Sequence, residues 1–252
     1  MQEILKERED RLREYFKLSS QDEIISKEAT EIELTAPIRE HLSRFNIEWH
    51  VIPSYTAVPL DDAYIKRLYP MCARNFAKHG AYSRSCREAI VLGHNRHQGR
   101  LIGVEATQKP KYLPGNRQFY GTPYGFDSTA DPFAQYLGRA GFLTGTRFAH
   151  NYASLRELVN LINNEWRKLS LLPRGYRLTI CPPAVFNLIG TIFHAEWSEA
   201  ESLELGFYRD DHGNAKCYAV GSNAPGDFSY IHQIENDSDW TLLGFRTALV
   251  PE

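Results

Sequence analysis

The sequence is poor in cysteine, and its cysteines do not stand at motif spacing. The 252 residues include four of them, Cys72, Cys86, Cys181 and Cys217, with no Cys-x-x-Cys pair. A zinc ribbon or a redox dithiol needs two thiols close together in sequence, and small disulfide frameworks are much richer in cysteine. We therefore expect free thiols.

Histidine-containing groups also lack the spacing of a known metal module. His94 and His97 stand in an expected turn without a third ligand beside them, and His79 lies between Cys72 and Cys86 at spacings that match no structural zinc site. From these patterns we expect no metal site, and the sequence names no cofactor.

Long apolar runs are absent, and so is a large net charge. No uncharged stretch reaches membrane-spanning length, and residues 1–10 lack the apolar core of a secretory signal. We expect a soluble, cytoplasmic protein that does not contact membranes. The net charge of −2 provides no general attraction to polyanions, so any such site has to be local.

Motifs that would name a reaction are missing as well. The chain contains no Walker-type phosphate loop, no His-Glu-x-x-His and no Gly-x-Ser-x-Gly. Whether the protein is an enzyme therefore stays open at the level of sequence.

What is present is the composition of a globular protein with mixed periodicity. Hydrophobic residues make up 42% and charged residues 24% of the chain, and neither a repeat nor a Pro/Ser-rich linker marks a boundary. We expect a charged helical segment over residues 1–28 and a single α+β domain over 29–252. Residues 1–17 are a candidate surface for a protein partner or for self-association, since so polar a helix has little to bury by itself.

Periodicity places the elements of that domain. We expect an antiparallel sheet, made of a C-terminal meander and a central hairpin, packed with helices from the N-terminal and central regions. The expected helices are 37–45, 131–137, 154–169 and 183–192, and the expected strands are 47–52, 88–92, 100–106, 177–181, 203–208, 217–220, 228–234 and 240–250.

The least regular stretch, residues 109–126, carries the leading functional hypothesis. It interleaves cations with aromatic rings and glycines, a combination that holds phosphates and stacks planar rings. We expect a non-catalytic binding or assembly protein that recognises a partner or an anionic, ring-containing ligand, such as a nucleotide or single-stranded nucleic acid. The alternative is a structural loop whose rings belong to the core. The candidate ligand-binding residues are Lys109, Lys111, Tyr112, Arg117, Phe119, Tyr120 and Tyr124.

Two enzymatic alternatives remain beside it. Glu88 at the start of one expected strand and Glu105 late in the next partly resemble the acidic residues of restriction-type nucleases, which hold a divalent metal. The lysine of that pattern is displaced and its aspartate is missing. Cys181 stands where a strand passes into a helix, a position that activates a thiol, with His150 or His194 as the base of a hydrolase or transferase. The alternative interpretation is that Cys181 is a small buried residue without a catalytic role.

Overall fold

The computed structural model describes the elements that form the core of the chain. The described residues are 2–25, 32–54, 57–58, 61, 63–64, 87–91, 93, 96–107, 131–139, 147, 150–199, 203–209, 214–221, 230–237 and 243–252. The loop 109–126 lies outside them, as do Cys72, His79, Cys86 and His94.

The first sheet is antiparallel and has the strand order β1-β2-β8-β3. Its strands come from distant parts of the sequence: β1 is Ile47–Ile52, β2 is Arg100–Glu105, β3 is Tyr176–Ile180 and β8 is Thr247–Pro251. Side chains alternate between the two faces of a strand. Ile47, Trp49 and Val51 of β1 therefore share one face, and Glu48 and His50 share the other.

The second sheet has the order β6-β5-β4-β7. β4 (Leu203–Arg209), β5 (Ala215–Gly221) and β6 (Tyr230–Ile234) form an antiparallel meander, and the short β7 (Gly244–Phe245) pairs with β4 in parallel. The chain then passes through Arg246 directly into β8 of the first sheet, so the last strands join the two sheets.

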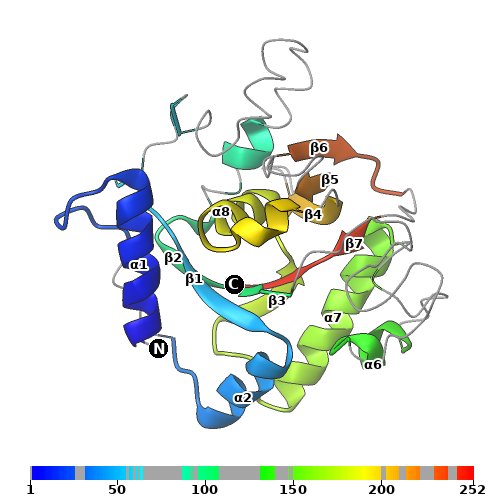
Figure 1. Ribbon diagram of the computed structural model, residues 1–252. Coiled ribbons are helices and arrows are strands. Elements are labelled where there is room, and N and C mark those ends of the chain that lie inside the picture. Colours follow the sequence, from blue (N-terminus) through cyan, green and yellow to red (C-terminus); the bar gives the residue numbers. More distant parts are fainter. Residues whose placement is uncertain are drawn as a thin grey trace.

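Helices cover both faces of the first sheet (Figure 1). α2 (Ala36–Arg44) and α7 (Tyr152–Lys168) lie below it in Figure 1, and the short α6 (Ala134–Leu137) packs on α7. α7 places four apolar side chains in the core at helical spacing, Leu155, Leu158, Ile162 and Trp166.

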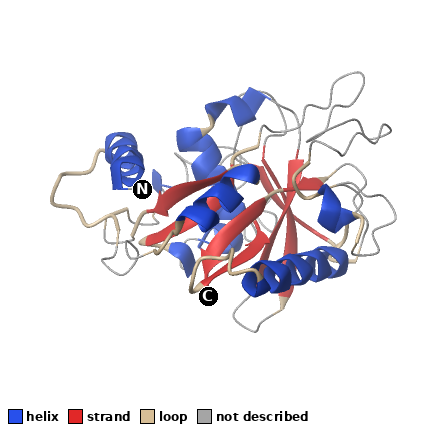
Figure 2. Ribbon diagram, turned by 90° about the horizontal axis from the view of Figure 1, so that it is seen from below, coloured by secondary structure: helices blue, strands red, loops and turns tan. Residues whose placement is uncertain are grey.

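α8 (Pro183–Phe193) lies on the opposite face of the first sheet, next to the second sheet (Figure 1). It is buried almost all round, which is typical of a helix enclosed by other elements. α1 (Gln2–Phe16) packs against β1 and α8 through Leu5 and Leu12, at one end of the molecule (Figure 2). The strand β1 is thus bordered on one face by both α1 and α8.

The α+β class with mostly antiparallel sheets is confirmed. Two pairings differ from the expectation. Residues 87–91 are helical, and β2 pairs with β1 instead. The expected strand 240–250 does not continue the meander, because β7 pairs with β4 in parallel and β8 belongs to the first sheet. The apolar run at 89–91 suits a buried helix as well as a strand, and periodicity cannot separate the two over so short a run. Within the described part of the chain, no helix is both long and apolar enough to cross a membrane.

Candidate metal centre

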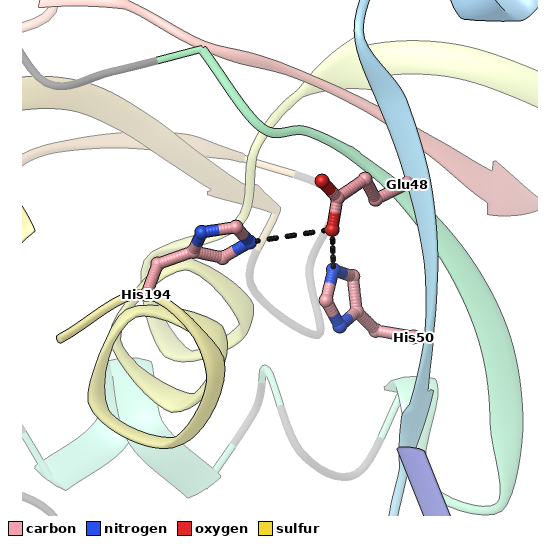
Figure 3. A group of neighbouring side chains, drawn as sticks. All are labelled: Glu48, His50 and His194. Atoms are coloured by element: carbon pink, nitrogen blue, oxygen red, sulfur yellow. Dashed lines mark ion pairs between the residues drawn. The ribbon is translucent and has the colours of Figure 1, made fainter. Parts of the chain in front are cut away.

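The clearest constellation of polar side chains lies on the face of β1 that α8 and α1 cover. Glu48 and His50 are two residues apart in the strand and therefore point the same way, toward the C-terminal end of α8. Figure 3 shows their side chains meeting His194, which reaches in from α8. Residues nearly 150 positions apart in the sequence thus form one group.

His194 is fixed in place by the residues that follow α8. It caps the C-terminus of that helix, and a 3₁₀ turn, Ala195–Glu199, begins directly after it. Its ring stacks on Trp197, with centroids 4.4 Å apart and planes at 8°. Its Nδ1 lies 2.9 Å from a carboxylate oxygen of Glu196. Since a carboxylate accepts, Nδ1 carries the proton of the neutral imidazole ring, and the lone pair of Nε2 faces Glu48.

The three donor atoms have the spacing of metal ligands. Oε2 of Glu48 lies 3.7 Å from Nε2 of His50 and 3.5 Å from Nε2 of His194. All three donor atoms lie within 4.8 Å of one another. In a tetrahedral zinc site with bonds of about 2.1 Å, neighbouring ligand atoms are about 3.4 Å apart. Small side-chain adjustments therefore bring the three atoms around one ion.

His50 is the most buried member of the group. Its side chain is 0% exposed, and neither of its ring nitrogens has a hydrogen-bond partner among the described residues. Burial, followed by the charges of Arg8 and His194, lowers the pKa of His50 well below its usual range. A buried polar atom without a partner costs free energy, so the position of Nε2 of His50 beside the carboxylate of Glu48 calls for an explanation.

Arg8 of α1 provides the nearest positive charge. Its guanidinium lies 2.9 Å from Oε2 of Glu48 and also sits over the ring of Phe193. The His194 side chain is the main cause that lowers the pKa of Glu48, and Arg8 contributes while burial opposes both. A carboxylate has about four lone-pair positions, so Glu48 can accept from Arg8 and still bind an ion.

The structure places Glu105 in a different, fully buried network. Nη1 of Arg147 lies 2.7 Å and 2.8 Å from its two oxygens, and Thr247 donates to it from both the backbone and the hydroxyl. Arg147 in turn makes a bidentate pair with Asp131 at 2.6 and 2.7 Å. Although burial alone raises the pKa of Glu105, Arg147 and these donors hold it below its ordinary value. Among the described residues, every hydrogen-bond partner of the Glu105 carboxylate is therefore a donor, and both carboxylate oxygens already accept hydrogen bonds.

The nuclease pair is not brought together by these contacts. Glu88 is on the 87–91 helix, with Nζ of Lys216 3.7 Å from its carboxylate, whereas Glu105 ends β2. A second buried pair, Arg246 with Glu204 at 2.9 Å, lies beside Glu105, because Arg246 also donates to the Glu105 carbonyl oxygen.

Cys181 is buried between β3 and α8. It is a free thiol that lies 3.8 Å from the carbonyl of Pro182, and burial raises its pKa above the ordinary value. His150 lies beside Ser154 and the ring of Phe245, and His194 belongs to the Glu48 group. Neither histidine is a hydrogen-bond partner of the thiol in the described part of the structure.

The remaining predicted site residues lie outside the described residues. These are Lys109, Lys111, Tyr112, Arg117, Phe119, Tyr120 and Tyr124, so their role in ligand binding stays a prediction. Sequence reasoning missed Glu48 and His50 as functional residues. Their i, i+2 spacing on a strand was the only available signal, and it gives no indication that His194 completes the group.

Comparisons with protein-family models, with curated proteins and with solved structures found no match for this chain.

Proposed function

We propose that this protein binds a divalent transition metal ion, of which Zn²⁺ is the best example, through Glu48, His50 and His194. The observation that carries the proposal is the pair of 3.5 and 3.7 Å distances between one carboxylate oxygen and two imidazole nitrogens, neither of which makes a hydrogen bond within the described part of the chain. A cation between these atoms gives all three lone pairs a partner.

The donor set selects the class of metal. Two imidazoles and one carboxylate suit zinc and its neighbours in the first transition row, while magnesium and calcium prefer oxygen ligands alone. The Glu196 carboxylate on Nδ1 of His194 corresponds to the outer partner that metal-binding histidines commonly have, because it fixes the ring and raises its basicity.

Three protein ligands leave one position of a tetrahedral ion open. Closed structural zinc sites use four protein ligands, whereas centres that bind water or a small substrate use three. The Glu48 side chain is 39% exposed, so solvent reaches the group from the side of the carboxylate. We therefore propose a centre with an exchangeable water ligand, which lowers the pKa of that water and polarises a bound oxygen.

A metal titration of the full chain tests this proposal. After treatment with a chelator, the protein is titrated with ZnCl₂ by calorimetry, and MgCl₂ serves as the comparison metal. We expect one Zn²⁺ per chain and no binding of Mg²⁺ at the same concentration. His194→Gln and Glu48→Gln each weaken zinc binding by more than the roughly ten- to hundredfold that loss of an outer partner costs.

Matched controls separate the site from surface effects. His232→Gln in β6 and the exposed Glu40→Gln in α2 remove the same side-chain types elsewhere and are expected to leave zinc binding unchanged. Zinc binding that survives unaltered in both His194→Gln and Glu48→Gln contradicts the proposal, as does an absence of binding in the wild-type protein.

We also propose, from the sequence, that residues 109–126 bind an anionic, ring-containing ligand. The substitutions Lys109→Ala, Lys111→Ala and Arg117→Ala test this hypothesis and are expected to weaken binding of nucleotides or oligonucleotides. Unchanged affinity in these variants counts against it.

A further inference from the structure

A second site, separate from the metal centre, lies at the other end of α8. It is a cavity of about 160 Å³ between the start of α7, the strand β3 and the end of β4. Its lining includes Pro182, the N-cap of α8, whereas His194 caps the C-terminus of the same helix. An 11-residue helix is about 16 Å long, so the two sites do not share ligands.

Positive charge gathers on the walls of this cavity from three elements. Arg96 comes from the segment before β2, Arg156 from the first turns of α7 and Arg177 from β3. Among the described residues that line the cavity none is acidic, and neither Arg156 nor Arg177 pairs with a carboxylate of the described part of the chain. Guanidinium groups are suited to bind an oxyanion bidentately, and Arg156 and Arg177 have no acidic partner among the described residues that would compete with such a ligand.

The positive charge also affects the pKa of a buried histidine in the wall of the cavity. His97 is 8% exposed, and its pKa is lowered to about 4, first by burial and then by Arg96, Arg177 and Arg100. Arg96 and Arg177 thus act electrostatically on a buried group of the wall.

Helix ends add partial positive charge. Tyr152 is the first residue of α7 and Pro182 is the N-cap of α8, and both line the cavity. The N-terminal end of a helix favours a nearby anion. The helix ends supplement the arginines and do not form the site alone.

Size and wall chemistry limit the ligand. A cavity of 160 Å³ is well below the roughly 300–1,000 Å³ that encloses a drug-sized molecule. Tyr152 and Phe207 form an edge-to-face pair at 5.1 Å on one wall. The cavity therefore has room for one compact charged group, with a ring surface beside it for whatever that group is attached to.

We propose that this cavity binds a phosphate group, either free or as a phosphate monoester, through Arg96, Arg156 and Arg177. The proposal does not depend on the metal centre, because none of its residues is a ligand there. Its residues are also other than those of the predicted 109–126 site.

Binding of inorganic phosphate and of adenosine monophosphate to the full chain tests the inference, measured by calorimetry at low ionic strength. Saturable one-to-one binding is expected. Arg156→Gln and Arg177→Gln are the informative variants because both side chains are exposed, so neither change removes a core contact. Each is expected to weaken binding by about tenfold or more, since each removes a charge-assisted hydrogen bond.

Arg174→Gln provides the matched control, because Arg174 is also exposed and lies three residues before Arg177 but does not line the cavity. It is expected to bind phosphate like the wild-type protein, and so is His194→Gln, which affects the metal centre alone. Tighter binding of the nucleotide than of phosphate identifies an organic monoester as the ligand, and equal binding identifies free phosphate. An affinity that Arg156→Gln and Arg177→Gln leave unchanged, or that Arg174→Gln lowers equally, overturns the proposal, as does no binding of either compound.

Discussion

Glu105→Gln is expected to destabilise the protein severely. The substitution keeps the shape of the side chain but replaces one oxygen by an amide that donates. Among the described residues, every hydrogen-bond partner of the Glu105 carboxylate is itself a donor: Nη1 of Arg147, the hydroxyl of Thr107, and the backbone N–H and hydroxyl of Thr247. A threonine hydroxyl can turn round and accept, but the guanidinium cannot. The amide therefore faces at least one buried donor, and Arg147 loses one of its two anionic partners.

The expected loss in the free energy of unfolding is about 3–5 kcal/mol, the usual cost of breaking a buried ion pair from one side. Urea denaturation followed by circular dichroism measures it. Glu40→Gln is the control, because Glu40 and its partner Arg44 are both more than two-thirds exposed, and such pairs contribute about 0.5 kcal/mol or less. A loss below about 1 kcal/mol for Glu105→Gln refutes the reasoning, and loss of a metal-dependent activity without loss of stability favours the nuclease hypothesis instead.

Three other outcomes follow from buried groups. Because burial, aided by Arg96, lowers the pKa of His97 to about 4, the unfolded chain takes up a proton below about pH 6.5 before the folded chain does. The free energy of unfolding, measured by urea denaturation, should therefore fall by up to about 3 kcal/mol from pH 6.5 to pH 4, and His97→Gln should flatten this dependence. Gly103→Ala places a Cβ 2.8 Å from Ile47 and should cost about 1–3 kcal/mol, while Gly138→Ala, whose nearest neighbour is 3.8 Å away, should cost nothing measurable by thermal unfolding. Cys181 should resist iodoacetamide at neutral pH until the protein is denatured, because burial raises its pKa.

Much of the fold follows from local patterns in the sequence. The spacing of Leu155, Leu158, Ile162 and Trp166 predicts α7, whose N-terminus lies slightly earlier than expected because Asn151, and not Ser154, is the N-cap. Ser154 takes part as the reciprocal member of that capping box. The meander β4-β5-β6 was likewise predictable, because its strands follow one another in the sequence and polar residues separate the apolar runs of β4 and β5.

The arrangement of the first sheet could not be predicted in the same way. Its strands pair across long separations, as when Gly103 meets Leu249, and no local pattern specifies which strand is the neighbour of which. The secondary structure of residues 87–91 could not be predicted from local sequence either, since their apolar residues pack equally well in a strand or in a helix.

The metal centre depends on just these long-range pairings. Glu48 and His50 are recognisable as neighbours on one strand face, but His194 reaches them only because the C-terminal end of α8 lies beside β1, where Phe193 and His194 contact the ring of His50. The buried position of Glu105 is equally invisible in the sequence, because its partners Arg147 and Thr247 come from other segments of the chain.

An X-ray absorption spectrum at the zinc edge, recorded on the full chain loaded with one equivalent of Zn²⁺, measures the proposed coordination directly. Binding by Glu48, His50 and His194 predicts a four-coordinate shell of nitrogen and oxygen at about 2.0–2.1 Å, with the outer-shell scattering of two imidazole rings that falls to one ring in His194→Gln. A shell that contains sulfur, or an oxygen shell without imidazole scattering, contradicts the assignment.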